Sequence, residues 1–190
     1  MSFNYFAVHK PYGMLSQFKD AVGRQILSNI FSFPKDVYPI GRLDMDSEGL
    51  LLLTNDKSLT DYLLNPKNEH EKEYYVQVEG IPTKEAMQKL RVGVVIEGIR
   101  TLPAKVKLID DPGFQERIPP IRERKTIPTS WISITITEGR NRQVRKMTAA
   151  AGFPTLRLVR VRIKNILLGN LKNGEVRTLT NEEIIGLKNR

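Results

Sequence analysis

The pattern of apolar and polar positions predicts more strands than helices. Residues 73–80 and 131–137 alternate with a period of two, and the apolar run Leu50–Leu53 has the length of a buried strand. Helical spacing follows polar residues that can cap a helix, such as Asp56 and Thr83. Because strands and helices do not alternate regularly, the pattern indicates an α+β fold with a mixed sheet. Further strands are predicted at 3–8, at 37–40, within 93–108, up to Arg162 and at 176–179, and further helices at 23–31, between Gly139 and Gly152 and from a cap at Asn181.

The strand at 73–80 has one largely apolar face, formed by Tyr74, Val76 and Val78. Alternation along a strand therefore places Tyr74 on the inward side. A half-buried tyrosine is most often a core residue whose hydroxyl has a partner, so spacing alone favours a structural role. An active-site role stays open as the alternative.

A polar segment, GRLDMDSEG at 41–49, separates two apolar stretches. It holds three carboxylates within five residues, Asp44, Asp46 and Glu48, with Arg42 beside them. Aspartate, serine and glycine are common in turns, but loops held between strands also commonly carry functional groups. From spacing alone, a turn and an active site explain this segment equally well.

Positive charge is concentrated late in the chain. The net charge is +9, and residues 139–164 contain eight basic residues and no acidic residue. A smaller basic cluster, RERK, lies at 122–125. Apolar residues interleave with the basic ones, which predicts a folded surface and favours a nucleic-acid partner over a merely solvated basic face. Arg142, Arg145 and Lys146 share one face of the predicted helix, which suits phosphate contact or an ion pair with a buried carboxylate.

Composition and motifs narrow the class of protein. At 190 residues the chain has the length of one domain, or of one domain with two lobes around a shared core. Without cysteine there is no disulfide or thiolate chemistry, and no apolar run approaches the roughly 20 residues of a membrane span. The N-terminus has no secretion signal, so a cytoplasmic location is expected. His9 and His70 are isolated and no phosphate-binding glycine motif is present, so neither a metal nor a nucleotide cofactor is expected.

Four segments resemble, in order, the motifs of the bacterial A-type (small-subunit) and large-subunit ribosomal pseudouridine synthases. They are HKPYGMLSQF (9–18), YPIGRLDMDSEGLLLLTND (38–56), KEYYVQVEG (72–80) and EGRNRQVRKMTAAAGFPTLRLVR (138–160). The segment PPIRERKTIPTSW (119–131) is most similar to the E branch of the large-subunit synthases, which acts on 23S rRNA. The resemblance implies an enzyme that isomerises a specific uridine of ribosomal RNA, expected to be 23S, to pseudouridine without a cofactor.

The resemblance also implies roles for residues of these motifs. Asp44 matches the aspartate that starts the reaction, Tyr74 matches the active-site tyrosine, and Arg145 matches the basic residue that pairs with the aspartate. Arg42 matches an arginine that helps to hold the target base out of its stack. Other basic residues are expected to bind RNA, namely Lys10, Arg140, Arg142, Lys146 and Arg160.

The fold implied by the resemblance is a mixed, largely antiparallel sheet with flanking helices and a cleft across the sheet. Many relatives carry an N-terminal S4-type RNA-binding domain, whereas the first family motif here starts at His9. Residues 1–190 are therefore expected to form a single catalytic domain without an S4 domain, acting as a monomer. Ser47-Glu48 stands where many relatives have Thr-Ser, a change within a loop that retains Asp44.

Two other functions are compatible with parts of the pattern. A non-catalytic rRNA-binding or ribosome-assembly factor would use the same basic surface. A glycosidase would pair Asp44 with Asp46 or Glu48, since both chemistries act at an anomeric carbon. The glycosidase leaves the basic segment unexplained, and the chain has a single Trp to bind sugars.

Overall fold

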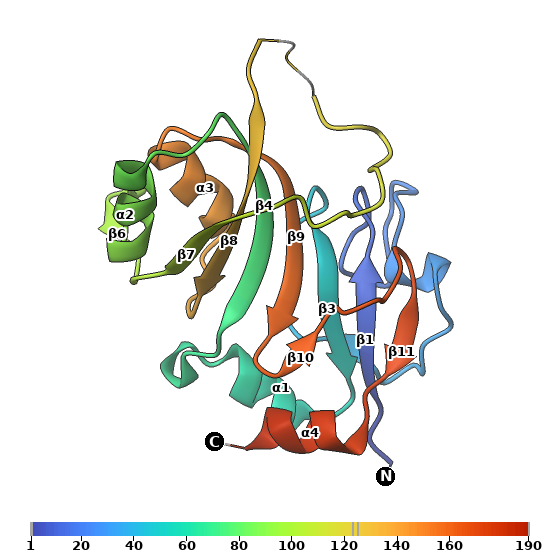
Figure 1. Cartoon of the computed structure of the whole chain (residues 1–190). Coiled ribbons are helices and arrows are strands. Elements are labelled where there is room, and N and C mark those ends of the chain that lie inside the picture. Colours follow the sequence, from blue (N-terminus) through green and yellow to red (C-terminus); the bar gives the residue numbers. More distant parts are fainter. Residues whose placement is uncertain (1, 123, 125, 190) are drawn as a thin grey trace. The chain divides into compact units, whose positions relative to one another are not determined.

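The computed structural model, shown in Figure 1, describes residues 2–122, 124 and 126–189. The chain divides into two compact units. The first unit contains the chain up to His70 and from Arg160 onward, and the second contains Glu71–Val159. Helices and antiparallel strands occur in both units, so the predicted α+β class with largely antiparallel pairing is confirmed.

The first unit is built on strands β1, β3 and β11, which lie side by side (Figure 1). β1 pairs antiparallel with both neighbours, so that Val8 faces Leu51 on one side and Val176 on the other. Every residue of β3 is buried, as its run of four leucines predicted. The strands of this unit are β1 (Tyr5–Lys10), β2 (Tyr38–Pro39), β3 (Glu48–Thr54), β10 (Ile166–Leu167) and β11 (Val176–Thr178), together with the end of β9 (Thr155–Ile163).

Helices α1 (Lys57–Leu64) and α4 (Asn181–Lys188) lie at the same end of these strands (Figure 1). Asp56 caps α1 by accepting a hydrogen bond from the Leu59 amide, as predicted. The cap of α4 lies one residue earlier than predicted, because the hydroxyl of Thr180, rather than Asn181, accepts a hydrogen bond from the Glu183 amide. The Glu183 carboxylate in turn accepts a hydrogen bond from the Thr180 amide. This reciprocal pair is a capping box.

The prediction of a helix at 23–31 is wrong, because this segment forms a single 3₁₀ turn, η1 (Leu27–Asn29). Tertiary contacts replace helical ones there. Ile26 forms a parallel bridge to Leu15, and the Leu27 amide donates to the Gln17 carbonyl at 3.0 Å. A second 3₁₀ turn, η2 (Pro66–Asn68), follows α1.

The second unit is built on β4 (Lys72–Glu79), β8 (Thr129–Ile136) and β7 (Lys105–Ile109), paired in that order. Helix α2 (Lys84–Val92) is capped by Thr83, as predicted, and lies against β7. Helix α3 (Gln143–Ala150) lies against the hairpin formed by β5 (Val95–Ile96) and β6 (Ile99–Arg100). The hairpin turns at Glu97-Gly98, where both residues have positive φ. The segment between Ile109 and Thr129 joins β7 to β8.

Candidate active site

Asp44 lies on an irregular loop that joins β2 to β3 in the first unit. The loop makes a turn in which the Ser47 amide donates to the Asp44 carbonyl at 3.0 Å. Asp44 is half-exposed, whereas Leu43, Ser47 and Glu48 around it are buried. The predicted turn is present and contains Asp44, and the role of Asp44 in a site stays a prediction.

Gly49 allows the β3 end of this loop to lie against β9. Its φ is +103°, and a Cβ atom placed there would stand 2.3 Å from the Arg160 carbonyl oxygen. A side chain at this position would therefore force the two strands apart. The Arg160 side chain, 5% exposed, reaches across and donates from Nε to the Leu50 carbonyl at 2.7 Å.

Lys10, at the end of β1, is completely buried beside the same loop. Its ammonium group donates to the carbonyls of Pro11 and Met14, at 2.8 and 2.7 Å. Burial lowers the pKa of Lys10 to about 8, although the carboxylates of Glu48, Asp46 and Asp44 act in the opposite direction, whereas Arg160 lowers it further. Lys10, Arg160 and the three carboxylates thus form one electrostatic cluster.

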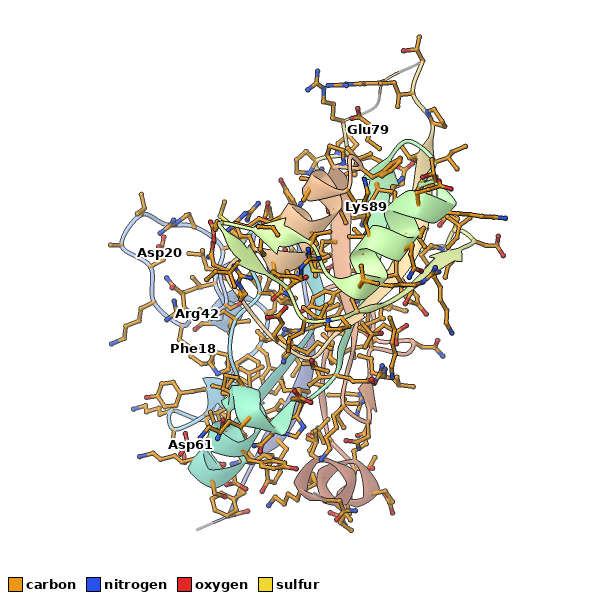
Figure 2. All side chains as sticks on the ribbon, turned by 90° about the vertical axis from the view of Figure 1, so that its left-hand side faces the viewer. Phe18, Asp20, Arg42, Asp61, Glu79 and Lys89 are labelled. Carbon is orange, nitrogen blue, oxygen red and sulfur yellow. The ribbon has the colours of Figure 1, made fainter. Side chains whose placement is uncertain are left out.

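The buried settings of Lys10 and Arg160 differ from the surface positions that the prediction of RNA binding assumed. Both cations bond to backbone carbonyls of their own unit, so they are placed to support the Asp44 loop. Arg42, in contrast, is exposed on the loop surface (Figure 2). Of the predicted residues, the first unit brings together Lys10, Asp44 and Arg160.

Tyr74 lies on β4 of the second unit with its side chain directed inward. It is 8% exposed, and Val76 and Val78 on the same face are completely buried. Residues of the other face, such as Tyr75, are half-exposed. The prediction that Tyr74 points inward is confirmed, and its role stays a prediction.

The loop before α3 is organised by Gln143, which the sequence reasoning missed. Gln143 is 3% exposed. Its side-chain oxygen accepts a hydrogen bond from the backbone amide of Arg140 at 3.0 Å, and its side-chain nitrogen donates to the Glu138 carboxylate. Arg142, the residue before the helix, adopts a left-handed conformation with φ of +52°. The available signal was spacing, because Gln143 lies four residues before the buried Met147 and so shares its helical face.

Two of the basic residues predicted to bind RNA, Arg140 and Lys146, contact the β5–β6 hairpin, and their RNA binding stays a prediction. The Arg140 guanidinium donates to the carbonyls of Ile96 and Ile99 at 2.9 and 3.2 Å. Lys146 forms a 2.7 Å ion pair with Glu97 at the hairpin turn. Arg142 is exposed, whereas Arg145 is half-exposed and its Nε atom is buried.

Potential metal ligands do not cluster in the described part of the chain. Within it, no three His, Cys, Asp or Glu residues are grouped in a way that could hold a metal ion. The described helices include none that is long and apolar enough to cross a membrane. Of the basic cluster predicted at 122–125, Glu123 and Lys125 lie outside the described residues.

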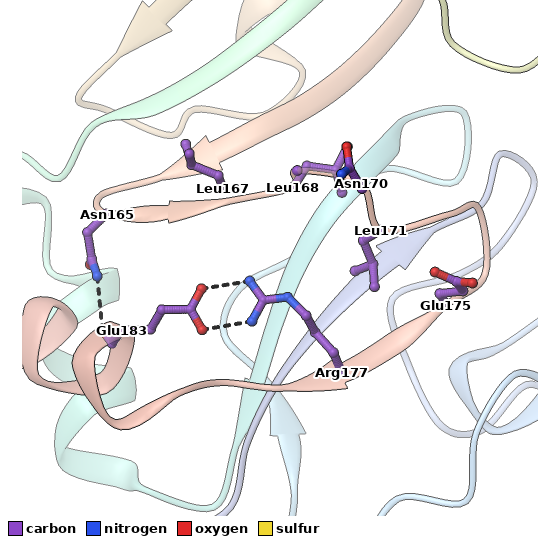
Figure 3. Close-up of a pocket in the computed structure, with 9 residues that line it drawn as sticks. Asn165, Leu167, Leu168, Asn170, Leu171, Glu175, Arg177 and Glu183 are labelled. Carbon is purple, nitrogen blue, oxygen red and sulfur yellow. Dashed lines mark hydrogen bonds and ion pairs between the residues drawn. The ribbon is translucent and has the colours of Figure 1, made fainter.

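A pocket of about 460 Å³ lies in the first unit, and the residues that line it include none of the predicted site residues (Figure 3). Its main charged groups neutralise each other, because Arg177 and Glu183 form two parallel hydrogen bonds of 2.7 Å. The Asn165 amide donates to the Glu183 carbonyl at 3.0 Å. Since these polar groups bond to each other, the pocket offers little to bind an anion such as RNA.

Comparison with known proteins identifies the class. Residues 4–150 match the model of the RNA pseudouridylate synthases, a span that includes parts of both units. The chain belongs to this family. It is 54% identical over 167 residues to the ribosomal large subunit pseudouridine synthase E of Vibrio parahaemolyticus, covering 88% of this chain and 70% of that relative. It is 41% identical over 185 residues to the ribosomal large subunit pseudouridine synthase B of Bacillus subtilis, covering 97% and 71%.

Solved structures agree with this assignment. A crystal structure of a pseudouridylate synthase matches with a TM-score of 0.81 and 29% identity, over 98% of this chain and 74% of that one. Human RNA pseudouridylate synthase domain containing 1 matches with a TM-score of 0.54 and 15% identity, over 93% and 78%, which shows a shared fold alone. The predicted family and the enzymatic class, a pseudouridine synthase, are therefore confirmed.

Proposed function

We propose that this enzyme converts a specific uridine of 23S rRNA into pseudouridine, with Asp44 as the carboxylate that starts the reaction. The observation that carries the proposal is the setting of Asp44, half-exposed on a loop with buried flanks inside the family match at 4–150. The choice of rRNA is supported by relatives named as ribosomal large subunit pseudouridine synthases.

The reaction explains why one carboxylate is enough. The N1–C1′ bond of uridine breaks, a C5–C1′ bond forms, C5 loses its proton and N1 gains one. No electrons are gained or lost overall and no group is donated. Asp44 can start the reaction by attacking C1′ or by removing a sugar proton to give a glycal. In either case the nucleotide must first leave its stack, which costs a few kcal/mol.

Tyr74 and Arg145 keep the roles that the family resemblance implies. Tyr74 is proposed to pack on the uracil ring and to assist removal of the proton from C5. Arg145 is proposed to supply the positive charge that a reacting carboxylate requires. Because the family match includes parts of both units, we propose that residues 1–190 form one catalytic domain. We further propose that it acts as a monomer in the cytoplasm. Gel filtration tests the monomer.

RNA binding is proposed for the basic residues that lie at the surface. Arg42 in the first unit and Arg142 in the second are exposed, so their guanidinium groups are accessible to phosphates. Each neutralised phosphate should add roughly −0.7 to −0.9 to the slope of log affinity against log salt. Substituting Arg42 with Ala should therefore make that slope less steep by about one unit, and an unchanged slope would argue against the contact.

Mapping of pseudouridines in rRNA tests the function directly. Cells that lack this protein should lose pseudouridine at one 23S position, and the wild-type gene should restore it. A gene carrying Asp44→Asn should restore the protein without restoring the modification. If the Asp44→Asn gene restores the modification, the catalytic assignment fails. If rRNA modification is unchanged in cells that lack the protein while ribosome assembly is impaired, the chain is an assembly factor instead.

A further inference from the structure

The backbone on both sides of Asp44 is bonded to a single neighbouring loop. The Ser16 hydroxyl accepts a hydrogen bond from the Leu43 amide at 3.1 Å and donates to the Leu43 carbonyl at 2.8 Å. The Gly13 amide donates to the Met45 carbonyl at 2.8 Å. Leu43 and Met45 are the two neighbours of Asp44, so these three hydrogen bonds hold the backbone of Asp44 in place.

This supporting loop is itself firmly anchored. Ser16 and Met14 are buried, at 6% and 3% exposure. The Lys10 ammonium group bonds to the carbonyls of Pro11 and Met14, and the Leu15 amide donates to the Gln25 carbonyl at 2.9 Å. A buried loop with these bonds has few alternative conformations, so it can set the position of the residues it holds.

We propose that Ser16 is a positioning residue for Asp44, and this rests on the proposed function of Asp44. The Ser16 hydroxyl holds the Leu43 backbone, and the direction of the Asp44 side chain follows from that backbone. Catalytic groups must be held within about 0.5 Å of their productive position by residues around them. Loss of the hydroxyl therefore allows Asp44 to move while its carboxylate remains chemically intact.

A purely structural role for Ser16 is the alternative, and the chain offers a matched control. At the opposite end of β3, the Thr54 hydroxyl also makes two buried hydrogen bonds. It donates to the Asn4 carbonyl at 2.7 Å and accepts from the Asp56 amide at 3.0 Å, and Thr54 is 3% exposed. Thr54→Val removes the same kind of group from the same unit without touching the Asp44 loop.

The test compares single-turnover pseudouridine formation, RNA affinity and melting temperature in Ser16→Ala, Ser16→Thr and Thr54→Val. Ser16→Ala should lower the rate at saturating RNA by about tenfold to a hundredfold, the size expected for a misplaced reacting group. Its RNA affinity should stay within about twofold of wild type, because the substitution removes no contact that binds the RNA equally before and during the reaction. Ser16→Thr, which keeps the hydroxyl, should recover most of the rate.

Thr54→Val should lower the melting temperature as much as Ser16→Ala does but leave the rate unchanged. Equal rates for Ser16→Ala and wild type, or equal rate losses for Ser16→Ala and Thr54→Val, would overturn the proposal. If Ser16→Ala does not fold, Ser16→Cys takes its place and should be slow for the same reason, since a thiol is a weak donor. An inactive wild-type protein would contradict the proposed function itself, and an active Asp44→Asn variant would contradict the role of Asp44.

Discussion

Strand β3 has an aspartate beyond each end, Asp44 before Glu48 and Asp56 after Thr54, and the first unit holds the two in different ways. The Asp56 carboxylate is buried and receives hydrogen bonds directly, from the Tyr5 hydroxyl at 2.8 Å among others. Asp44 is half-exposed, and the bonds that fix its place in the loop go to the backbone of its two neighbours.

This is the difference that we expect between a structural carboxylate and the carboxylate that we propose to react. Burial acts to raise the pKa of Asp56, but hydrogen bonds from Ser58, the Leu59 amide, Lys188 and Tyr5 outweigh it and hold that pKa well below its usual range. A carboxylate bonded in this way stabilises the fold and is not available to a substrate. Asp44 is half-exposed and is the carboxylate that we propose to meet the substrate, so substitutions at the two ends should have opposite consequences.

The largest effect is expected from Asp44→Asn. It should lower the rate of pseudouridine formation at least about a thousandfold, as loss of a reacting group does in other enzymes. RNA affinity and the free energy of unfolding should change little, because Asp44 is half-exposed. Single-turnover assays measure the rate, a binding titration measures the RNA affinity, and urea denaturation measures the free energy of unfolding. Asp46→Asn, a nearby half-exposed carboxylate, is the control and should cost less than about tenfold. A comparable loss in both variants would show that the loop, not Asp44, is required.

Asp56→Asn should give the reverse result, with the rate kept and stability lost. Removing this charge leaves buried partners unsatisfied and should lower the free energy of unfolding by about 3 kcal/mol at pH 7. Because the pKa of Asp56 is depressed in the folded state, its contribution is present above about pH 4 and is lost as the pH falls through the folded pKa. The deficit of the variant in urea denaturation should therefore shrink in acid. Asp61→Asn, at an exposed position of α1 (Figure 2), should behave as wild type.

The sequence predicts well those features that depend on near neighbours. The cap at Asp56 and the inward direction of Tyr74 each follow from residues within a few positions. The prediction of a helix at 23–31 is wrong because the Leu27 amide donates a hydrogen bond to the Gln17 carbonyl, a contact that the spacing of apolar residues cannot reveal. Local patterns are overridden where partners lie on another segment.

For the candidate site, the family motifs identify residues but not their surroundings. Lysines are rarely buried, so a surface position was the natural expectation for Lys10. Its burial depends on Pro11 and Met14 carbonyls that turn back toward it and on carboxylates such as Glu48. Ser16 lies within the motif at 9–18, but the sequence does not reveal its partner, because Leu43 is 27 residues away.

Lys10, beside the Asp44 end of β3, makes the free energy of unfolding depend on pH in alkaline solution as well. Its folded-state pKa of about 8 lies below its usual 10.5, so the unfolded chain binds more protons between these values. The cost of burying the charge is complete below about pH 8 and is relieved as the pH rises to 10.5. The free energy of unfolding of wild type should therefore rise by about 3 kcal/mol relative to that of Lys10→Met over this window. Urea denaturation at about pH 7.5 and about pH 10 checks this, and parallel pH curves would contradict it.

The smallest effect is expected at the Asp56 end, from Tyr5→Phe. The Tyr5 hydroxyl donates to Asp56 and accepts from the Lys188 ammonium group, each at 2.8 Å. Lys188 also contacts Asp56 directly at 3.0 Å, so the ion pair survives the loss of the hydroxyl and the cost should be only about 1 kcal/mol. Tyr62→Phe is the control, because that hydroxyl makes a single 3.3 Å bond at the surface and should cost less than about 0.5 kcal/mol. Pseudouridine formation should be unchanged in both variants, since neither hydroxyl supports the Asp44 loop. A rate loss in Tyr5→Phe would show that the two ends of β3 are coupled.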